Sequence, residues 1–528
     1  MKYLLVFLVV LLLVPLANGQ ELTPHGPIRI VGNSDFDADH GVVSGSGTAE
    51  DPYVIAGWDI DASDSQYGIF IRDTTAYFVI RNCRIRNATM VGIFLSSLSH
   101  GTIERVSVEG GDFGVLVDYS GEILIRNLTV MGSERSLQLG YSHNVIVENS
   151  TLEGKIVISS TREDDWVTLE FVNVSVGGGP FVYIYGAEGE INLGDFKEVY
   201  IRSCRDAHIS GGFYDDIIGI FVSNATNTVI EDMEIHNSTS GIEITYSNGL
   251  RLNSLKFANV SASINVVNSV ISVESITVEG QSKINFMYAS ATMKDVSAMN
   301  ASIEMRYQRN SSLNNVEIRM MKFWYSENVT LRDSRFSNYD FYGLMIKESR
   351  DMVVDNCTFE DNMNDGMQII NSAGAYIVNS TFRRNENGIS IMNSSGVEVY
   401  HNLFYRNRGY GIYIDGTSKG NVIHENSFMY NHYTSDHFNA RFRQAADYGE
   451  NLWNLTKGNY WTDWTGPDDD GDGIVDNPYP LKGGAMDYRP LTEPPWTPIP
   501  EILNPVVIVA VFALCLRMIG KKRNMKKS

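Results

Sequence analysis

Cysteine is scarce in this sequence, with four among 528 residues. Cys515 lies in an apolar stretch near the C-terminus, while Cys83, Cys204 and Cys357 are far apart along the chain and form no CxxC pair. This spacing excludes a disulfide framework and a CxxC metal site. We expect the last three to be small, buried core thiols.

Basic residues are few relative to acidic ones. The chain has 42 Lys and Arg against 63 Asp and Glu, which gives a net charge of −21 and a pI of about 4.9. This balance argues against nucleic acid as a partner and against adhesion to an anionic membrane face. The acidity is spread along the chain and suits a solvated exterior surface or cation binding.

Long apolar runs mark the two ends of the chain. Residues 1–19 combine one Lys, an apolar run and a small-residue pattern, which predicts a secretory signal peptide. At the other end, a Pro-rich stalk at 493–500 precedes a predicted transmembrane helix at 501–520 and a basic tail at 521–528. The positive-inside rule then predicts a single-pass protein of the cell membrane, with an extracellular body and a cytoplasmic C-terminus.

The C-terminal segment has a second interpretation. The apolar stretch is short for a membrane span and contains Pro505 and Arg517. Stalk, apolar stretch and basic tail together also resemble the sorting signals that sortase-like enzymes of prokaryotes cut and replace with a lipid. Retention of the anchor and its processing both remain open.

A phrase of one glycine and three strand-forming residues recurs along the body of the chain. It begins at Gly68, Gly92, Gly114, Gly219, Gly241, Gly366, Gly388 and Gly411. A period of about 23 residues is typical of a solenoid, in which each repeat buries its apolar face against its neighbours. Short strands of period two with Gly, Asn and Ser turns predict an all-β fold, a right-handed parallel β-helix of about 16 coils, rather than a helical array.

A second phrase follows each first one and contains a polar position, often Asn. We interpret this position as a ladder at an inside turn, which predicts that Asn356, Asn379, Asn402 and Asn426 form one inward-facing row. The ladder matters for glycosylation sequons as well, because a buried amide cannot accept a glycan. The sequons on the ladder are at Asn127, Asn149, Asn173, Asn356 and Asn379.

Both ends of the solenoid are predicted to be capped, because open coils expose strand edges. The sequence divides into an N-terminal cap at 20–65, a β-helix at 66–432 and a C-terminal cap at 433–492. Through the segments 26–58 and 451–491 the chain resembles the NosD-like right-handed β-helix family. This family includes a periplasmic accessory protein of copper maturation and many archaeal surface proteins, and its coils resemble carbohydrate-binding and sugar-hydrolase repeats.

The C-terminal cap contains an acidic loop with the spacing DxDxDGxxD. Side chains at the first, third and fifth positions converge on a hard cation, so we expect structural calcium. Tyr479 stands where an EF-hand has its bidentate Glu, so a complete EF-hand is not expected. The candidate ligands are Asp468, Asp470, Asp472 and Asp476, with Asp487 as a possible source of the missing carboxylate.

Catalytic signals are weak. Enzymes of this fold that act on polysaccharides use clustered carboxylates, often beside basic groups. The repeat predicts Glu360 beside Arg383 and Arg406, and Asp361 beside Arg384. A substrate subsite is one interpretation, and an outward ion-pair ladder on a solvated face is the simpler one.

Copper would require clustered His, Met or Cys. The four histidines of the last coils and the following loop are His401, His424, His432 and His437, and a run of methionines comprises Met287, Met293, Met299 and Met305. The methionine spacing of six does not match the coil period, so these side chains should scatter as core filler. Copper is therefore assigned to no residue.

Two main function classes follow. The first is an exported, membrane-anchored, non-catalytic protein that binds glycans or cell-envelope components. The second is an extracellular polysaccharide lyase or hydrolase, and copper delivery is a third possibility that rests on the family resemblance. We favour the first, because exposed aromatic residues can form sugar platforms. The candidates for these platforms are Trp324, Tyr325, Tyr339 and Tyr342.

Overall fold

The computed structural model describes residues 21–337, 340–434, 437–438 and 443–495. The predicted signal peptide, transmembrane helix and basic tail lie outside these residues, as does most of the stalk. Among the described residues, no helix has the length and apolarity needed to cross a membrane. Contacts divide the chain into two compact units. Unit 1 comprises Met1–Tyr185 and Asp195–Tyr200, and unit 2 comprises Gly186–Gly194 and Ile201–Ser528.

Unit 1 is a parallel β-solenoid. One of its sheets has six strands, namely β2 (Ile28–Val31), β6 (Tyr67–Thr74), β9 (Val91–Leu98), β11 (Phe113–Asp118), β13 (Arg135–Gly140) and β15 (Lys155–Ser159). The glycine phrase lies in these strands. Its apolar residues alternate inward, so that Ile69, Ile93 and Val115 stack with no exposed surface. The solenoid pattern ends in an irregular segment with the short helix α1 (Glu163–Val167) and an antiparallel pair of strands, β16 (Leu169–Val176) and β17 (Gly179–Tyr185).

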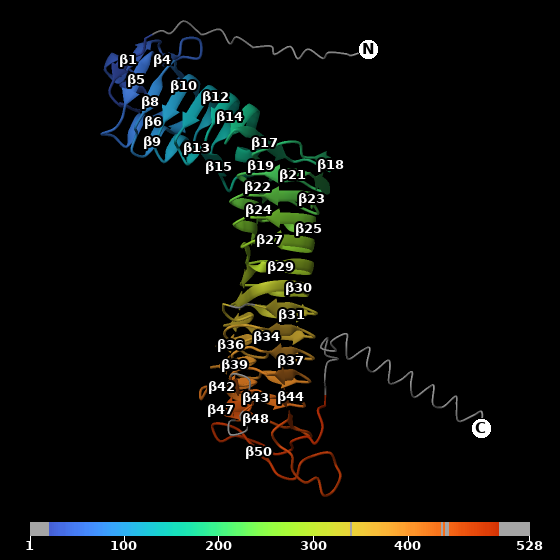
Figure 1. Cartoon of the computed structure of the whole chain (residues 1–528). Helices are drawn as coiled ribbons and strands as arrows, with labels where there is room; N and C mark the ends of the chain where they lie inside the picture. Colours follow the sequence, from blue (N-terminus) through green and yellow to red (C-terminus); the bar gives the residue numbers. More distant parts are fainter. Residues whose placement is uncertain (1–20, 338–339, 435–436, 439–442, 496–528) are drawn as a thin grey trace, which may run out of the picture. The chain divides into compact units, whose positions relative to one another are not determined.

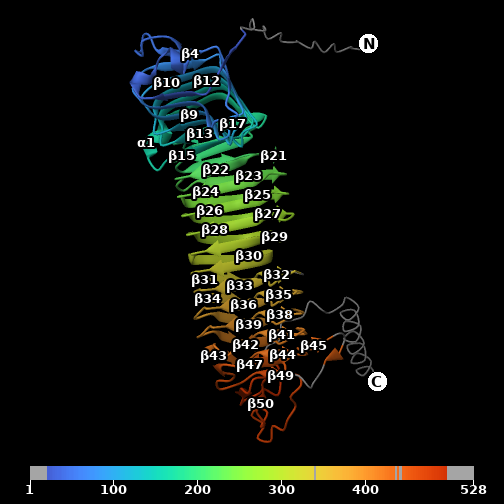
Figure 2. The same cartoon turned by 90° about the vertical axis from the view of Figure 1, so that its left-hand side faces the viewer.

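Unit 2 continues the same architecture in its own stack of coils (Figures 1 and 2). One column of parallel strands contains β24 (Ser240–Thr245), β26 (Ala262–Val267), β28 (Lys283–Met287), the C-terminal parts of β29 (Ser290–Arg306) and β30 (Arg309–Trp324), β33 (Leu344–Lys347), β36 (Met367–Ile370) and β39 (Ile389–Met392). Inside the last coils, Phe336, Phe359, Phe382, Phe404 and Phe428 form a continuous ring stack. The all-β solenoid that the repeat predicts is confirmed, with about 17 turns.

The solenoid begins before residue 66 and continues after residue 432. Strands β2, β4 (Tyr53–Ala56) and β5 (Trp58–Asp61) already pair in parallel with the next coil. At the other end, β47 (Ala445–Asp447), β48 (Glu450–Leu452) and β49 (Tyr460–Trp461) pair in parallel with the preceding coil. Segments assigned to caps thus complete coils, although they lack the glycine phrase.

The corners of the coils use left-handed backbone, and this corrects the predicted ladder. Asn356 and Asn379 have φ of 52° and 51° and point outward, whereas Asn402 and Asn426 are fully buried. The backbone N–H of Asn402 donates to Oδ1 of Asn426 at 3.0 Å. Asn is favoured at a left-handed corner for backbone reasons and at the next position for hydrogen bonding, so the sequence pattern merged two adjacent columns.

The same correction applies to the sequons. Asn127, Asn149, Asn173 and Asn356 are exposed at left-handed corners, and Asn379 is half-buried there. The prediction that burial protects these five side chains from glycosylation is therefore wrong. By contrast, Cys83, Cys204 and Cys357 are free and buried, as expected.

Candidate functional site

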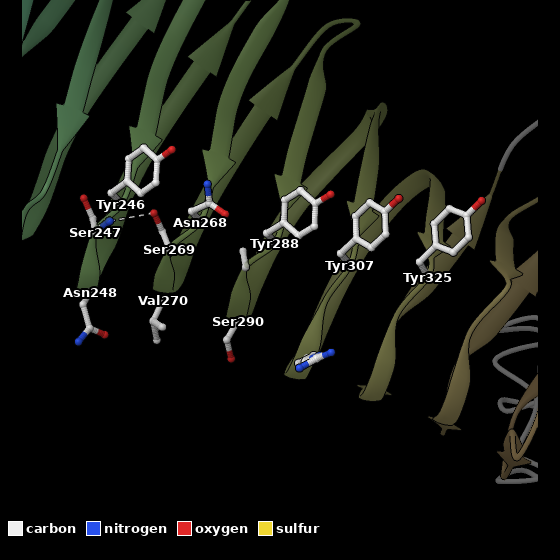
Figure 3. A pocket seen from close by; sticks show the side chains of 12 residues that line it. Tyr246, Ser247, Asn248, Asn268, Ser269, Val270, Tyr288, Ser290, Tyr307 and Tyr325 are labelled. Carbon is white, nitrogen blue, oxygen red and sulfur yellow. Dashed lines mark hydrogen bonds between the residues drawn. The ribbon is translucent and has the colours of Figure 1, made fainter. Parts of the chain in front are cut away.

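One corner column of unit 2 is occupied largely by tyrosines. Tyr246, Tyr288, Tyr307 and Tyr325 all adopt left-handed backbone, with φ between 50° and 55°. Their exposed fractions are 68%, 53%, 39% and 46%. Each follows the end of a strand in the column that runs from β24 to β30. The solenoid therefore places the four rings in one row on its surface (Figure 3).

Tyrosine at such a corner lowers the stability of the fold. A bulky side chain in left-handed backbone costs roughly 1–2 kcal/mol, because its Cβ approaches the following carbonyl oxygen, while Asn tolerates this conformation. Asn268, Asn371 and Asn393 occupy the same column. The exposed rings do not recover the cost by core burial. Residues held in costly backbone conformations cluster at binding sites, so the row is a candidate functional surface.

Three neighbouring rings of the row are stacked nearly parallel to one another. Tyr288 and Tyr307 have ring centroids 4.5 Å apart and planes inclined by 8°, and Tyr307 and Tyr325 are 5.0 Å apart at 9°. These distances are close to one strand spacing, about 4.7–4.9 Å. Tyr288, Tyr307 and Tyr325 remain 53%, 39% and 46% exposed, so part of each side chain stays open to solvent. The row presents a stepped aromatic surface with hydroxyl groups at its edge.

A shallow groove of about 760 Å³ runs beside the tyrosines. The residue after each corner points into the core, and the residue after that points out again. Two parallel ridges therefore flank a floor of backbone. The first ridge is the tyrosine row with Asn268, and the second comprises Asn248, Val270, Ser290 and Arg309. Below the floor, Ser247 and Ser269 are buried, and the Ser247 N–H donates to Oγ of Ser269 at 3.0 Å.

This groove combines the two properties that sugar recognition requires. Open ring faces can stack on the apolar face of a pyranose ring, and phenol hydroxyls, Ser and Asn side chains can bond to its hydroxyl groups. The groove lies along the stack of coils rather than reaching into the core, which suits an extended ligand.

Unit 1 repeats the motif on a smaller scale. Tyr119 and Tyr141 have φ of 47° and 46°, and their rings stack at 5.0 Å and 3°. Ser120 and Ser142 follow them, are buried, and form the same interior bond, with the Ser120 N–H donating to Oγ of Ser142 at 3.1 Å. The device is thus a property of the repeat and not of one coil.

Sequence reasoning identified only one member of the row, Tyr325. The signal that would have found others is a tyrosine followed by serine, five residues after the glycine of the repeat phrase, as in Gly241 with Tyr246 and Gly114 with Tyr119. The coils of Tyr288 and Tyr307 lack that glycine, and Ala289 and Gln308 replace the serine. The pattern is therefore hidden in the coils where the ring stack is continuous.

The other predicted platforms lie elsewhere. The Arg306 guanidinium lies 4.7 Å from the centroid of the Trp324 ring, and the Lys347 ammonium lies 5.3 Å from the same centroid. Cations of the protein therefore already contact this ring. Tyr342 is half-buried, and burial raises the pKa of its phenol to about 12. Tyr339 lies outside the described residues.

Glu360 and Asp361 do not form an open carboxylate pair. Glu360 is only 2% exposed, and it contacts Arg335, Arg383 at 2.6 Å and Arg384 at 3.1 Å. The predicted neighbour Arg383 is confirmed, but Tyr405 and not Arg406 follows it in the strand register. Asp361 pairs with Arg384 at 2.6 Å, as predicted.

The Glu360 carboxylate is therefore not part of an outward, solvated ladder. The arginines that bond to it shield it from solvent. A buried carboxylate with several guanidinium partners is a structural element that holds β32 (Arg335–Ser337), β35 (Thr358–Glu360) and β38 (Thr381–Arg383) together.

The acidic loop brings three of its five predicted ligands together. Asp468, Asp470 and Asp472 have carboxylate oxygens within 4.8 Å of one another. The Asp476 carboxylate accepts a bond from the Asp469 N–H at 3.1 Å and is not in this cluster.

Asp487 lies apart from the cluster, in the core of the C-terminal cap. It is fully buried and accepts bonds from the backbone N–H of Asn459 at 2.7 Å and from the indole of Trp461 at 3.0 Å. Burial raises the pKa of its carboxyl group to about 6. These donors give Asp487 a structural role without a metal.

Among the described residues, no group of three His, Cys, Asp or Glu ligands contains one of the histidines considered for copper. The carboxylates of Asp468, Asp470 and Asp472 form the one group of three His, Cys, Asp or Glu ligands found there. His424 is buried between Glu398 and Glu425, each 3.2 Å away, and the side chain of His437 lies outside the described residues. Of the methionine run, Met293 and Met305 are buried core residues, whereas Met299 is 39% exposed.

The chain belongs to the right-handed β-helix family. Residues 43–195 and 320–441, together more than half of the chain, match the model of the right-handed β-helix region. This model does not distinguish the NosD-like type within the family. No curated protein matches the sequence.

Several solved structures are similar to the chain at low identity. The A-module of mannuronan C-5 epimerase AlgE4 from Azotobacter vinelandii is 11% identical, with 52% of this chain and 87% of that one covered and a TM-score of 0.28. The periplasmic alginate epimerase AlgG is 10% identical, with 82% and 85% covered and a TM-score of 0.24. Tailspike protein 3 of bacteriophage CBA120 is 11% identical, with 80% and 61% covered and a TM-score of 0.20. Likenesses at this level say nothing about activity.

Proposed function

We propose that this protein is a non-catalytic carbohydrate-binding protein and that the tyrosine-lined groove of unit 2 is its binding site. The observation that carries the proposal is the row of exposed tyrosines in left-handed backbone, since this conformation costs stability and the rings gain little burial in return. A ligand that stacks on the rings would explain why tyrosines occupy these corners.

The chemistry around the row favours carbohydrate over other ligands. A net charge of −21 disfavours nucleic acid. The groove is shallow and open to solvent, unlike the enclosed apolar pockets that take small lipophilic molecules. The two carboxylates considered for catalysis are engaged by arginines, which supports binding without turnover.

Binding is tested with the full-length chain on a glycan array, followed by affinity measurement on the best polysaccharide. The double variant Tyr288→Asn, Tyr307→Asn should lose at least tenfold in affinity, or about 1.4 kcal/mol. Asn already stands at Asn268 in this column, so the corners accept it and the fold should be retained.

Tyr430→Asn is the matched control, because Tyr430 also has left-handed backbone (φ 57°) and is 44% exposed but lies outside the groove. Equal affinity of the wild type and the double variant would show that the tyrosine-lined groove is not the binding site. New reducing ends or unsaturated products during incubation would establish the lyase or hydrolase alternative instead.

We also propose that the body is exported and held at the cell membrane, exposed to extracellular polysaccharide or cell-envelope components. The sequence of residues 1–19 and the apolar stretch with its basic tail at 501–528 support this. Fractionation of cells that express the full chain and a version truncated before Glu501 tests it. Release of the full chain into the medium without processing would contradict the anchor.

A structural calcium ion in the C-terminal cap is a separate proposal. It rests on the convergence of Asp468, Asp470 and Asp472. Three carboxylates in one turn match the hard oxygen ligands that calcium prefers, and Gly473 has the positive φ of 84° that a sharp turn requires. The ion would hold the cap closed and take no part in sugar binding.

A further inference from the structure

The groove of unit 2 does not end with the tyrosines. A second section of about 630 Å³ adjoins the first and shares Tyr325 with it. Its first ridge continues the corner column as Glu348, Asn371 and Asn393, and its second ridge contains Glu327 and Arg350. The two sections form one strip along the stack of coils.

The backbone of the strip is the same in both sections. Glu348, Asn371 and Asn393 have φ of 50°, 50° and 45°, like the tyrosines before them. The floor again lies over a buried ladder, in which the Ser349 N–H donates to Oγ of Ser372 at 3.1 Å. Seven steps from coil to coil separate Tyr246 from Asn393, which corresponds to about 34 Å at one strand spacing per step.

The chemistry of the two sections differs. The first offers ring faces, and the second offers amides and one ion pair. Asn393 Nδ2 donates to Oδ1 of Asn371 at 3.0 Å, and both side chains are exposed, so the rest of their donors and acceptors face solvent. Arg350 and Glu327 are paired at 2.7 Å on the opposite ridge.

The charges along the whole strip are balanced. Arg309 and Arg350 are its cations, and Glu327 and Glu348 are its anions. A ligand that carried one charge per sugar would meet as much repulsion as attraction. Hydroxyl groups, in contrast, can accept from the guanidinium groups, donate to the carboxylates and do either with the amides.

We infer that the ligand is an internal stretch of a long, linear, uncharged polysaccharide, which lies parallel to the stack of coils and contacts both sections. This inference rests on the proposed function. One sugar unit of an extended chain is about as long as one strand spacing, so the strip takes about seven units. Aromatic rings stack on one half of the ligand, and the amides of the second section form hydrogen bonds with the hydroxyl groups of the other half.

The test measures affinity against chain length, using the full-length protein with cello-, manno- and chito-oligosaccharides of two to ten units and with alginate oligosaccharides as charged comparators. For the uncharged series that binds, affinity should rise up to about seven units and then level off. The charged series should bind at least tenfold more weakly at equal length.

Variants separate the two sections. Asn371→Gly with Asn393→Gly removes the amides, and glycine accepts left-handed backbone without strain. This variant should lose about tenfold on the longest oligosaccharides and nothing on the shortest, whereas Tyr288→Asn with Tyr307→Asn should weaken both. Asn356→Gly, at a left-handed corner outside the strip, is the control for folding.

The possible failures are distinguishable. Affinity that levels off at three or four units, with no effect of the Gly variant, would overturn the long-ligand inference and leave the tyrosine groove in place. Tighter binding of the charged series would overturn the uncharged class. Absence of binding to every oligosaccharide and polysaccharide would overturn the proposed function as well.

Discussion

At the scale of single residues, unit 1 contains a carboxylate that burial keeps from ionising. Glu198 has no exposed surface, and its Oε2 accepts a bond from the Ile156 N–H at 3.0 Å. Its Oε1 is buried without a hydrogen-bond partner among the described residues. Desolvation raises the pKa of this carboxyl group to about 8, against which the Ile156 bond and the nearby Lys155 charge act more weakly.

This residue predicts a pH dependence of stability. Between the ordinary pKa of 4.5 and the folded pKa of about 8, the unfolded chain releases a proton that the folded chain keeps, so stability falls as pH rises through this window. Glu198→Gln imitates the protonated form. Its thermal midpoint should equal that of wild type at pH 4.5 and exceed it at pH 8.5, by at most roughly 5 kcal/mol in free energy.

The informative quantity is the difference between the two proteins, because other carboxylates titrate in both. A difference that stays constant from pH 4.5 to pH 8.5 would show that Glu198 does not carry the dependence. Gln138, also in unit 1 and also with a buried unpaired oxygen, provides a non-titrating control through Gln138→Ala.

At the scale of structural elements, the sequence predicted the strands of the coils better than the corners between them. The glycine phrase and its alternation correctly placed the inward residues of β6, β9 and β11, because a period of two has only one apolar face. The corner itself was misread by one residue at Asn356 and Asn379. Side-chain type does not distinguish an Asn that tolerates left-handed backbone from an Asn that bonds inside the core.

The acidic loop is the element whose stability we expect to depend on the calcium concentration. If calcium binds at Asp468, Asp470 and Asp472, it stabilises the native cap by linkage, by about 2.7 kcal/mol at a concentration one hundred times the Kd. The thermal midpoint should therefore rise with calcium and fall with chelator, and Asp470→Asn should abolish the response.

Asp487→Asn is the matched control for this loop. Asp487 lies in the cap core, where its partners are Asn459 and Trp461, so the variant should change the baseline midpoint and keep the calcium response. Loss of the response in Asp487→Asn, or an unchanged midpoint of wild type with and without calcium, would contradict the assignment of the ligands.

At the scale of the whole molecule, the repeat predicted the right-handed β-helix family. Most steps of the period between residues 82 and 426 are 18–24 residues long, but the two steps from Asn173 through Ser203 to Asp232 are 30 and 29. The division into two units falls in this stretch, close to the irregular segment around α1 and β17. The number of residues in one coil sets the period, and the two long steps mark the stretch where the coils become irregular. The tyrosine-lined groove was hidden from the sequence, since its rows join residues about 20 positions apart.

The central claim is that carbohydrate binds along the tyrosine row of unit 2, and chemical footprinting tests it most directly. The full-length protein is nitrated with and without saturating polysaccharide, and each tyrosine is read by mass spectrometry. Binding along the row should protect Tyr246, Tyr288, Tyr307 and Tyr325 and leave the labelling of the exposed Tyr376 and Tyr430 unchanged. Protection confined to tyrosines outside the row, while the polysaccharide is bound, would contradict it.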